Sequence, residues 1–417
     1  MPLGRFGKGS YPAGARRCGR YLLAALVVVL VAALFVFVFV QLRRPLPRLA
    51  VAPSLPPSLS MTGPRPSLPW PTQGEATLVL QGVGSLGSAG GDAPVPLASV
   101  TKVMTALLVL KDHPIAPGVQ GPVITVTPAD VATYASELAL DESGVQVVAG
   151  EQLTEFEALE GLLLPSANNF ADMLAVWDAG SVSAFVTQMN TEAEALGLTG
   201  THYVEPSGFD PGNVGTASDQ VHLAQVALEN PTFASIVAEP EATLPVVGTI
   251  QNVDSDLGHD GIIGVKTGSE SAAGGCFVFA AQQGVGGLRA TITGAVLGQQ
   301  GATPLTSALE LAEQLVASAF SSLRAVTLLG RGQSAAHVVV PWSSPVSVTA
   351  KQAVRVIWPS GTPITSRARF LRPYVGLRRG SRLGMVAVTI GEEHIDIPLF
   401  TAREVPGPSL LWRLTHG

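Results

Sequence analysis

Residues Pro96–Leu110 read PLASVTKVMTALLVL and place Ser99 and Lys102 at the start of an apolar run. We expect this run to form a buried helix, because almost every residue after Lys102 is apolar. A spacing of three residues is about one helical turn, so the hydroxyl and the amine share one face. The stretch therefore offers a candidate nucleophile beside a candidate base.

A membrane-spanning candidate lies on the N-terminal side of this stretch. Tyr21–Val40 is an uncharged apolar run of the length that crosses a bilayer as a helix. Five Lys and Arg residues precede the run and three follow it closely, at 43, 44 and 48, which favours a cytoplasmic tail at 1–20 and an anchor at 21–40. A cleaved signal peptide is the alternative, because Ala50-Val51-Ala52 resembles a cleavage site. The length of the run favours the retained anchor.

Residues 41–73 are rich in Pro, Ser and Leu. Proline fixes φ and lacks a backbone donor, so we expect a semi-rigid linker without a core of its own. This linker would hold the following residues away from the membrane and outside the cytoplasm.

Residues 74–322 carry the pattern of an α+β domain. Thr154 and Glu157 form a predicted capping box, and two more helices are expected before Gly197. Strands are expected at 76–81, 261–268, 275–282 and 288–298, and a long amphipathic helix at 306–320. No regular element is predicted for 124–153. Residues 82–87 match a dinucleotide-binding glycine pattern, but no βαβ unit surrounds them, so we interpret them as a hairpin loop.

Residues 323–417 consist of short β-rich segments separated by Gly, Pro and Ser. We expect a small, separate all-β domain. This region pairs no nucleophile with a base, so a packing or binding role is expected. Leu410–Leu414 could contact a membrane surface, but the segment is too short to anchor the chain.

Composition excludes several classes of protein. The net charge of the 417 residues is −6, and the Lys and Arg residues form no evident stripe, so we do not expect nucleic acid as a partner. Cys18 precedes the apolar run and Cys276 lies far downstream of it, so an anchor would place the two cysteines on opposite sides of a membrane. We therefore expect no disulfide framework. No Cys or His pair has metal-ligand spacing, and we predict neither a metal nor a cofactor.

Three short motifs follow one another along the chain: Ser99-Val-Thr-Lys102, Ser166-Ala-Asn168 and Lys266-Thr-Gly268. Taken singly, Ser166 is explained as a helix cap, Asn168 as a turn residue and Lys266 as a strand-edge charge. However, only four lysines follow the apolar run, and two of them occupy these motifs. The combination favours one site assembled from three segments.

The order and spacing of these motifs resemble the D-alanyl-D-alanine carboxypeptidases, the low-molecular-mass penicillin-binding proteins. The resemblance rests on PLASVTKVMTALLVL, LTEFEALEGLLLPSANNFADMLA, FVTQMNTEAEALGLTGTHYVEPSGF and GVKTGSESAAGGCFVFAA, and covers about residues 74–320. It implies an antiparallel sheet flanked by helices. It also implies a serine peptidase that removes the terminal D-alanine from peptidoglycan stem peptides and is acylated by β-lactams.

The resemblance assigns catalytic roles to three residues. Ser99 would attack the carbonyl between the two D-alanines, Lys102 would be the base, and Ser166 would relay a proton to the leaving amine. Lys102 must lose its proton to act, and we expect burial and the positive charge of Lys266 to lower its pKa.

The remaining roles concern binding. Asn168 would hold the substrate's peptide amide, and Lys266 and Thr267 would bind its terminal carboxylate. Gly268 would let the strand approach the substrate closely. The backbone N–H groups of Ser99 and Ser269 would form the oxyanion hole.

Two departures from the family pattern stand out. Ala167 replaces the usual glycine or aspartate, and GQQGATPL after the last strand lacks the arginine often found near the substrate carboxylate. His202 and Glu205 are interpreted as structural loop residues.

Two other functions remain open. The first is a β-lactamase or esterase on the same scaffold, although no Glu-x-x-Leu-Asn run marks a dedicated deacylating carboxylate. The second is a catalytically weak scaffold protein that binds the cell wall.

Overall fold

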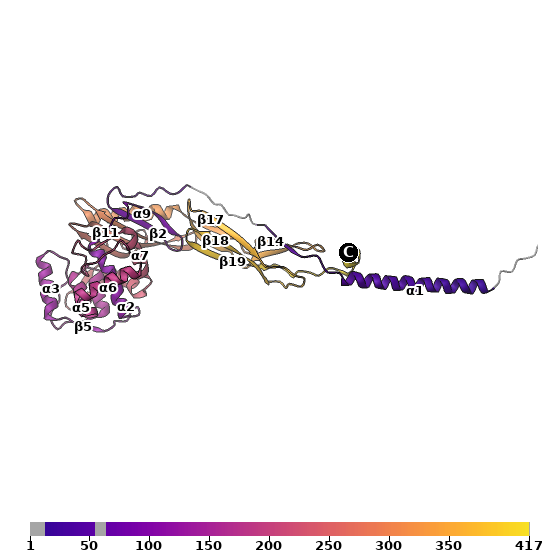
Figure 1. Cartoon of the computed structure of the whole chain (residues 1–417). Helices are drawn as coiled ribbons and strands as arrows, with labels where there is room; N and C mark the ends of the chain where they lie inside the picture. The colour runs from indigo at the N-terminus through magenta and orange to yellow at the C-terminus, as the bar shows by residue number, and fades with distance from the viewer. Residues whose placement is uncertain (1–12, 55–63, 417) are drawn as a thin grey trace, which may run out of the picture.

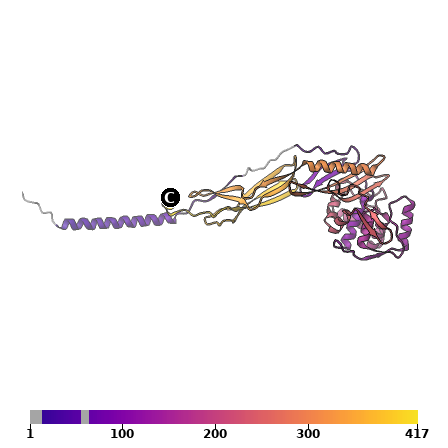
Figure 2. The same cartoon turned by 180° about the vertical axis from the view of Figure 1, so that it is seen from behind.

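The computed structural model describes residues 13–54 and 64–416, with side chains from residue 19 onward. The predicted cytoplasmic tail and Cys18 therefore fall largely outside the described residues. Helix α1 (Ala13–Arg43) projects from one end of an elongated molecule, and the helix-rich lobe lies at the other (Figures 1 and 2). Gly19–Arg43 has a mean hydropathy of 3.3 in its most apolar window, none of which is buried. By length and composition, this helix suits a membrane span or a signal sequence.

The segment after α1 makes contacts with the folded part of the chain that its composition did not indicate. Strand β1 (Ala50–Pro53) pairs antiparallel with β14 (Ser334–Val339), with Ala50 opposite Val339. Further along, Leu68 is buried, and the ring of Trp70 lies against Gly87. Composition alone could not reveal these contacts, because the strand is short and its partner lies almost 300 residues away.

A five-stranded antiparallel sheet forms the centre of the domain that holds the three motifs. Its order is β10 (Ile262–Glu270), β11 (Gly274–Val285), β12 (Leu288–Gln299), β2 (Glu75–Leu80) and β3 (Gly84–Ala89). The predicted loop at 82–87 is thus a β2–β3 hairpin whose second strand begins at Gly84.

Both faces of this sheet are covered. Phe277 and Phe279 belong to the hydrophobic cluster shared with α9 (Pro304–Ser322), whereas Val278 and Ala280 belong to the cluster shared with α7 (Ala217–Leu228). Alternate side chains of a strand point to opposite faces, so β11 is buried on both sides. This explains its continuous apolar sequence.

A helical lobe packs beside the sheet. The capping box at Thr154 is confirmed, since Thr154 and Glu157 bond reciprocally at the start of α4. The prediction missed α3, which begins with a second capping box at Thr127 and Asp130. Glu137 is the one buried residue of α3, and Val131 and Tyr134 are only partly buried against the core, so the helix carries a weak apolar signal. The helices of the lobe are α2 (Lys102–Asp112), α3 (Pro128–Ala139), α4 (Glu155–Leu163), α5 (Asn168–Ala179), α6 (Val182–Ala195) and α8 (Pro231–Val237).

Several short elements complete this part of the chain. These are β4 (Val95–Pro96), η1 (Ala98–Thr101), β5 (Val123–Thr125), β6 (Gln152–Thr154), β7 (Val214–Gly215), β8 (Glu241–Leu244), β9 (Gly248–Gln251) and η2 (His259–Gly261). The η1 turn contacts β10, and α2 contacts α4, α5 and α6. The nucleophile segment therefore lies between the sheet and the helical lobe.

The C-terminal region is built from strands and lies between α1 and the five-stranded sheet (Figure 1). Its elements are β13 (Leu323–Leu329), β14, β15 (Val346–Ala350), β16 (Val354–Pro359), β17 (Ile364–Phe370), β18 (Arg382–Ile390), β19 (Glu393–Thr401) and α10 (Leu410–Thr415). One hydrophobic cluster continues from α9 into these strands. A domain boundary at residue 322 therefore remains a proposal.

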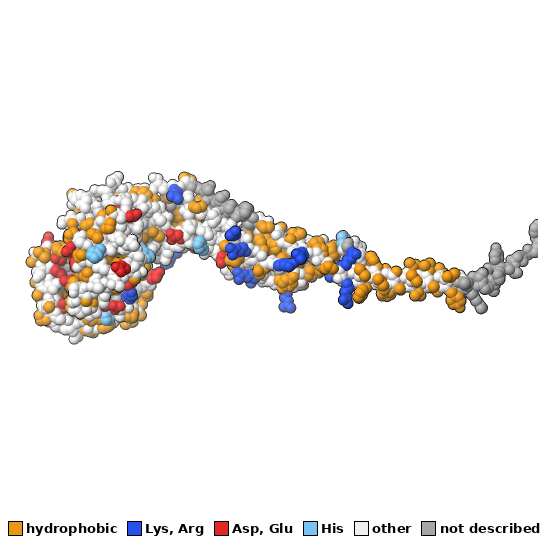
Figure 3. All heavy atoms as spheres, in the orientation of Figure 1, with side chains coloured by type: hydrophobic (Ala, Val, Ile, Leu, Met, Phe, Trp, Pro, Cys, Tyr) orange, Lys and Arg blue, Asp and Glu red, His pale blue; other side chains and the backbone are white. Residues whose placement is uncertain are grey.

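Charge is segregated along the molecule, which corrects the reading of a chain without a basic region. Residues 74–322 contain 27 Asp and Glu but only 4 Lys and Arg, whereas residues 323–417 contain 4 and 12. Figure 3 shows most of the red side chains on the part formed by the helical lobe and the five-stranded sheet, and most of the blue ones along the C-terminal strands. The mild net charge hides two regions of opposite sign.

Candidate active site

Ser99 and Lys102 lie on adjoining turns, with Ser99 in η1 and Lys102 at the first position of α2. Lys102 is completely buried, and Ser99 is 9% exposed. The Lys102 Nζ atom lies 2.9 Å from Ser99 Oγ, as the spacing predicts. Ala98, just before the serine, has φ 49°, a left-handed conformation that costs a non-glycine residue energy. The nucleophile thus sits on a strained turn.

Two further acceptors surround the Lys102 amine. Nζ donates to Asn168 Oδ1 at 2.6 Å and to the Ser207 carbonyl at 2.8 Å. A carbonyl oxygen only accepts hydrogen bonds, whereas a serine hydroxyl also donates. In the neutral amine, the two N–H groups are used by these carbonyls, and the lone pair is left for the Ser99 hydroxyl. The arrangement therefore suits Lys102 as a base toward Ser99.

A second hydrogen bond, made by its nitrogen, holds the side-chain amide of Asn168. Its Nδ2 donates to Glu142 Oε2 at 2.6 Å, which sets the orientation of the amide and turns Oδ1 toward Lys102. Asn168 thus orients the Lys102 amine, and its contact with the substrate remains a prediction.

Ser166 lies two residues before Asn168 in the turn between α4 and α5. Its φ is 68°, again left-handed, and its buried Oγ has no hydrogen-bond partner in the described part of the chain. An unpaired buried hydroxyl is costly, which argues against a purely structural role as a helix cap. No hydrogen bond to Lys102 or Ser99 is present among the described residues, so its relay role remains a prediction.

Strand β10 brings the third motif against the nucleophile turn. A Cβ at Gly268 would lie 2.9 Å from Ser99 N, so a side chain there would push the strand away. Lys266 and Thr267 are almost fully buried, and Lys266 Nζ donates to the Thr267 carbonyl at 3.0 Å. Ser269 follows Gly268 on this strand. The structure therefore brings the second and third motifs to Ser99 and Lys102.

Burial is the main cause that lowers the pKa of Lys102, to about 8. Four carboxylates oppose the shift: Glu205, Glu270, Glu137 and Glu142. Lys102 and Lys266 also repel each other when both are protonated, because like charges disfavour each other in a buried site. Burial and the charge of Lys102 lower the pKa of Lys266 well below its usual value.

This pKa predicts the pH dependence of acylation. Lys102 must be neutral to accept the Ser99 proton, so the rate of acylation by penicillin should rise with pH and level off above about 8. Below that value, the rate should fall roughly tenfold per pH unit. Stopped-flow measurement with a fluorescent penicillin between pH 5.5 and 9.5 checks this. A flat profile would contradict a neutral lysine as the base.

Sequence reasoning missed the part played by the loop at residues 204–213. The Glu205 carboxylate accepts hydrogen bonds from the backbone N–H groups of Ser207 and Gly208 and from the Asn213 side chain. This network holds the Ser207 carbonyl on Lys102. Gly208 has φ 91°, and a Cβ there would lie 1.8 Å from the Ala98 carbonyl oxygen. The Pro206-Ser-Gly208 turn signal marked this loop, but nothing local indicated its contact with Lys102.

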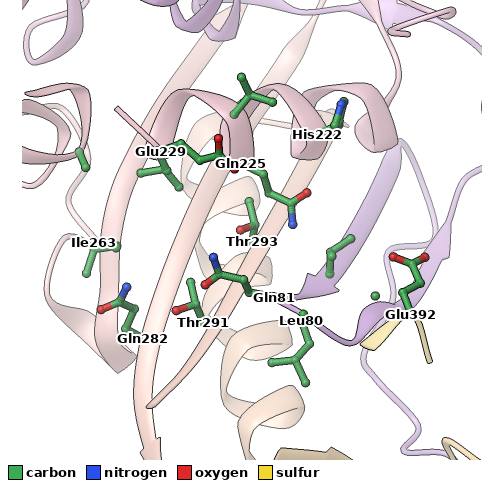
Figure 4. A pocket seen from close by; sticks show the side chains of 16 residues that line it. Leu80, Gln81, His222, Gln225, Glu229, Ile263, Gln282, Thr291, Thr293 and Glu392 are labelled. Carbon is green, nitrogen blue, oxygen red and sulfur yellow. The ribbon is translucent and has the colours of Figure 1, made fainter. Parts of the chain in front are cut away.

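A hollow of about 590 Å³ lies between α7 and the sheet, apart from these residues (Figure 4). Gln81, Gln225 and Gln282 project into it, and none of the residues of the three motifs lines it. Elsewhere, Asp256, His259 and Glu313 bring possible ligand atoms within 4.8 Å of one another. The expectation of a metal-free protein therefore stays a prediction.

The family model described as D-alanyl-D-alanine carboxypeptidase matches residues 85–300, more than half of the chain. The chain belongs to this family. All three motifs lie inside the matched range, so the resemblance inferred from the motifs is confirmed.

Curated members of the carboxypeptidase family show the same similarity. D-alanyl-D-alanine carboxypeptidase DacB2 of Mycobacterium tuberculosis is 39% identical over 205 residues, which are 47% of this chain and 66% of that relative. A D-alanyl-D-alanine endopeptidase of Pseudomonas aeruginosa is 36% identical over 172 residues, 41% of this chain and 52% of that protein. The matches span about half to two thirds of these relatives.

Solved structures support the α+β fold, with an antiparallel sheet flanked by helices. The Streptomyces K15 DD-transpeptidase matches with a TM-score of 0.53 and 28% identity, covering 63% of this chain and all of that one. The carboxypeptidase DacD of Francisella tularensis matches with a TM-score of 0.56 and 20% identity, covering 83% of this chain and 96% of that one. This second likeness concerns the fold alone.

Proposed function

We propose that this protein is a serine-type D-Ala-D-Ala carboxypeptidase, which removes the terminal D-alanine from peptidoglycan stem peptides. One observation carries the proposal: Lys102 Nζ lies 2.9 Å from Ser99 Oγ, while Asn168 and Ser207 accept its N–H groups. Membership of the carboxypeptidase family supports the substrate class.

Acylation begins when Ser99 Oγ attacks the carbonyl between the two D-alanines and its proton passes to Lys102 Nζ. The backbone N–H groups of Ser99 and Ser269 stabilise the oxyanion that forms. The nitrogen of the leaving D-alanine then receives a proton from Lys102 through Ser166. The C–N bond breaks, leaving the peptide as an ester on Ser99.

Binding of the substrate carboxylate prepares the base. The carboxylate approaches Lys266 and Thr267, and its negative charge favours the protonated form of Lys266. Two buried ammonium groups disfavour each other, so a proton held on Lys266 favours a neutral Lys102. The substrate carboxylate that binds to Lys266 and Thr267 therefore also favours the neutral form of Lys102, which is the form that accepts the Ser99 proton.

Hydrolysis of the acyl-enzyme repeats the chemistry with water. Lys102 takes a proton from water, the hydroxide adds to the ester, and the Ser99 oxygen leaves with a proton. An amine in place of water would give transfer to a new peptide bond. Relatives named endopeptidase and transpeptidase make the choice of acceptor a point to measure.

We further propose that α1 is a single-pass anchor with its N-terminus in the cytoplasm and the catalytic domain outside. The exposed apolar surface of Gly19–Arg43 supports a membrane span. The excess of basic residues before the span supports the direction.

The test uses the full chain in detergent micelles, because truncation at residue 74 would remove the β1–β14 pair. The wild type and Ser99→Ala are incubated with a fluorescent penicillin, and D-alanine release from a pentapeptide is then assayed. We expect stable labelling and D-alanine release from the wild type, and neither from Ser99→Ala.

Other outcomes would identify the alternatives. An unlabelled wild type would refute the acyl-enzyme mechanism. Labelling without release of D-alanine would favour a cell-wall-binding scaffold, and rapid loss of the label would favour a β-lactamase.

A further inference from the structure

Three possible metal ligands come together where the turn before β10 meets α9, and none of them belongs to the three motifs. Asp256 and His259 lie in this turn, and Glu313 lies on α9. One ligand atom from each residue lies within 4.8 Å of the others. Because Glu313 is 54 residues from His259 along the chain, no local spacing marks this cluster in the sequence.

The backbone of the turn at 254–261 brings the first two ligands together. The His259 N–H donates to the Asp256 carbonyl oxygen at 2.8 Å, and Gly258 between them has φ 86°. This left-handed conformation suits glycine. The Asp256 N–H is held in turn by Asp254 Oδ1 at 3.0 Å. Hydrogen bonds within the turn therefore fix the positions from which both side chains project.

Asp256 offers an acceptor that the described part of the chain does not use. The residue is 8% exposed, and its buried Oδ2 has no hydrogen-bond partner among the described residues. Burial raises the pKa of Asp256, and the charge of Glu313 adds to this effect, whereas His259 opposes it. A buried carboxylate oxygen without a partner is costly, and a cation beside it removes that cost.

The domain has no spare lysine or arginine for these carboxylates. Residues 74–322 contain only four such residues. Lys102 and Lys266 are buried in the active site, and Lys111 and Arg289 bond to side chains elsewhere. Further positive charge for the cluster must therefore come from outside this domain.

The separation of His259 and Glu313 fits two ligands of one metal ion. Nδ1 of His259 lies 3.3 Å from Oε1 of Glu313. Two ligands of a tetrahedral zinc ion, each about 2.0–2.1 Å from the metal, lie about 3.3–3.4 Å apart. A charge-assisted hydrogen bond between a nitrogen and a carboxylate oxygen is shorter, at about 2.7–2.9 Å. The observed distance therefore favours a shared metal over a direct ion pair.

We propose that Asp256, His259 and Glu313 bind a divalent transition-metal ion, with zinc as the expected ion and water completing its coordination. An imidazole together with carboxylates suits zinc, whereas calcium and magnesium prefer oxygen ligands alone. The site is independent of the serine chemistry. It runs against the expectation of a metal-free protein, which rested on motif spacing.

A metal ion here would fasten the turn before β10 to α9. The same segment reaches the second motif, since the Val253 N–H donates to the carbonyl of Leu164, two residues before Ser166. It then leads into the strand that carries Lys266. The three ligands meet only in the folded chain, so binding of the ion also stabilises the fold.

Zinc binding tests the inference without requiring catalysis. The full chain, without a polyhistidine tag and freed of metal by a chelator, is titrated calorimetrically with zinc chloride in detergent micelles. We expect one zinc ion per chain, and a melting temperature about 5 °C higher when free zinc reaches about a hundredfold its Kd. In His259→Ala, zinc affinity should fall roughly 100-fold, because losing a ligand costs at least as much as losing the group that orients one.

Glu313→Gln should weaken zinc binding as His259→Ala does. The side chains of His259 and Glu313 are 66% and 34% exposed, so both variants should fold. Two matched controls should keep the zinc affinity of the wild type. Glu310→Gln removes a carboxylate one turn away on α9, and His222→Ala removes an exposed histidine on α7; neither residue belongs to the ligand set.

Contrary outcomes would overturn the site in different ways. No zinc binding, or equal binding by His259→Ala and the wild type, would leave only an ion pair between His259 and Glu313. Calcium binding as tight as that of zinc would refute the assignment to a transition metal. An equal loss of affinity in Glu310→Gln would indicate attraction by general negative charge instead of coordination.

Discussion

Replacing Lys102 by arginine is expected to lower the rate of acylation by penicillin roughly 10³-fold, in the range of a lost general base. The guanidinium keeps its proton at any accessible pH, so it has no lone pair for the Ser99 hydroxyl. It is also wider than an ammonium, and the pocket formed by Asn168 Oδ1 and the Ser207 carbonyl is completely buried. Stopped-flow labelling measures the effect.

Lys111→Arg is the matched control. Lys111 lies on the same helix but is exposed and pairs with Glu192 at the surface, so acylation should be unchanged. Lys102→Arg with near-normal acylation would remove Lys102 from the role of base. A normal melting temperature of Lys102→Arg would show that loss of acylation is not loss of folding.

Gly208→Ala is expected to lower acylation roughly 10²-fold and to destabilise the protein as well. The backbone at Gly208 is left-handed, which costs alanine about 1–2 kcal/mol. The added Cβ would lie 1.8 Å from the Ala98 carbonyl oxygen and 2.9 Å from Thr101 Oγ1. Either the nucleophile turn or the loop that carries the Ser207 carbonyl must move. A displacement of about 1 Å at such a site is enough for a 10²-fold loss.

Gly197→Ala separates the effect of left-handed backbone strain from the effect of the steric clash with Ala98. Gly197 has φ 72°, but an added Cβ would meet no atom within 4 Å. This variant should lose stability in a thermal melt and keep its rate of acylation. Equal acylation by the two variants would mean that the contact between Gly208 and Ala98 does not position the site.

The sequence was informative where function depends on local spacing. Ser99 and Lys102 are one turn apart, and this spacing led directly to their contact. The capping box at Thr154 and the doubly buried strands of the sheet were also readable, because each leaves a short-range pattern.

Long-range features could not be read in this way. The carbonyl of Ser207 reaches Lys102 across 105 residues, and a backbone carbonyl has no sequence signature. Strand β1 finds its partner only in the folded chain. Five carboxylates that line one hollow come from three separate segments, so their proximity could not be seen along the chain: Glu137, Glu142, Asp172, Glu205 and Asp210. Helix α3 was missed because it is largely exposed.

The segregation of charge makes the protein an electric dipole along its length. Its basic end, at residues 323–417, lies nearest to α1, and its acidic end carries the active site (Figures 1 and 3). If α1 anchors the chain as proposed, a negatively charged membrane surface attracts the near end and repels the far end. The field then exerts a torque that keeps the molecule upright, and salt weakens this torque by screening. Orientation toward the wall would thus be set by electrostatics in addition to the β1–β14 contact.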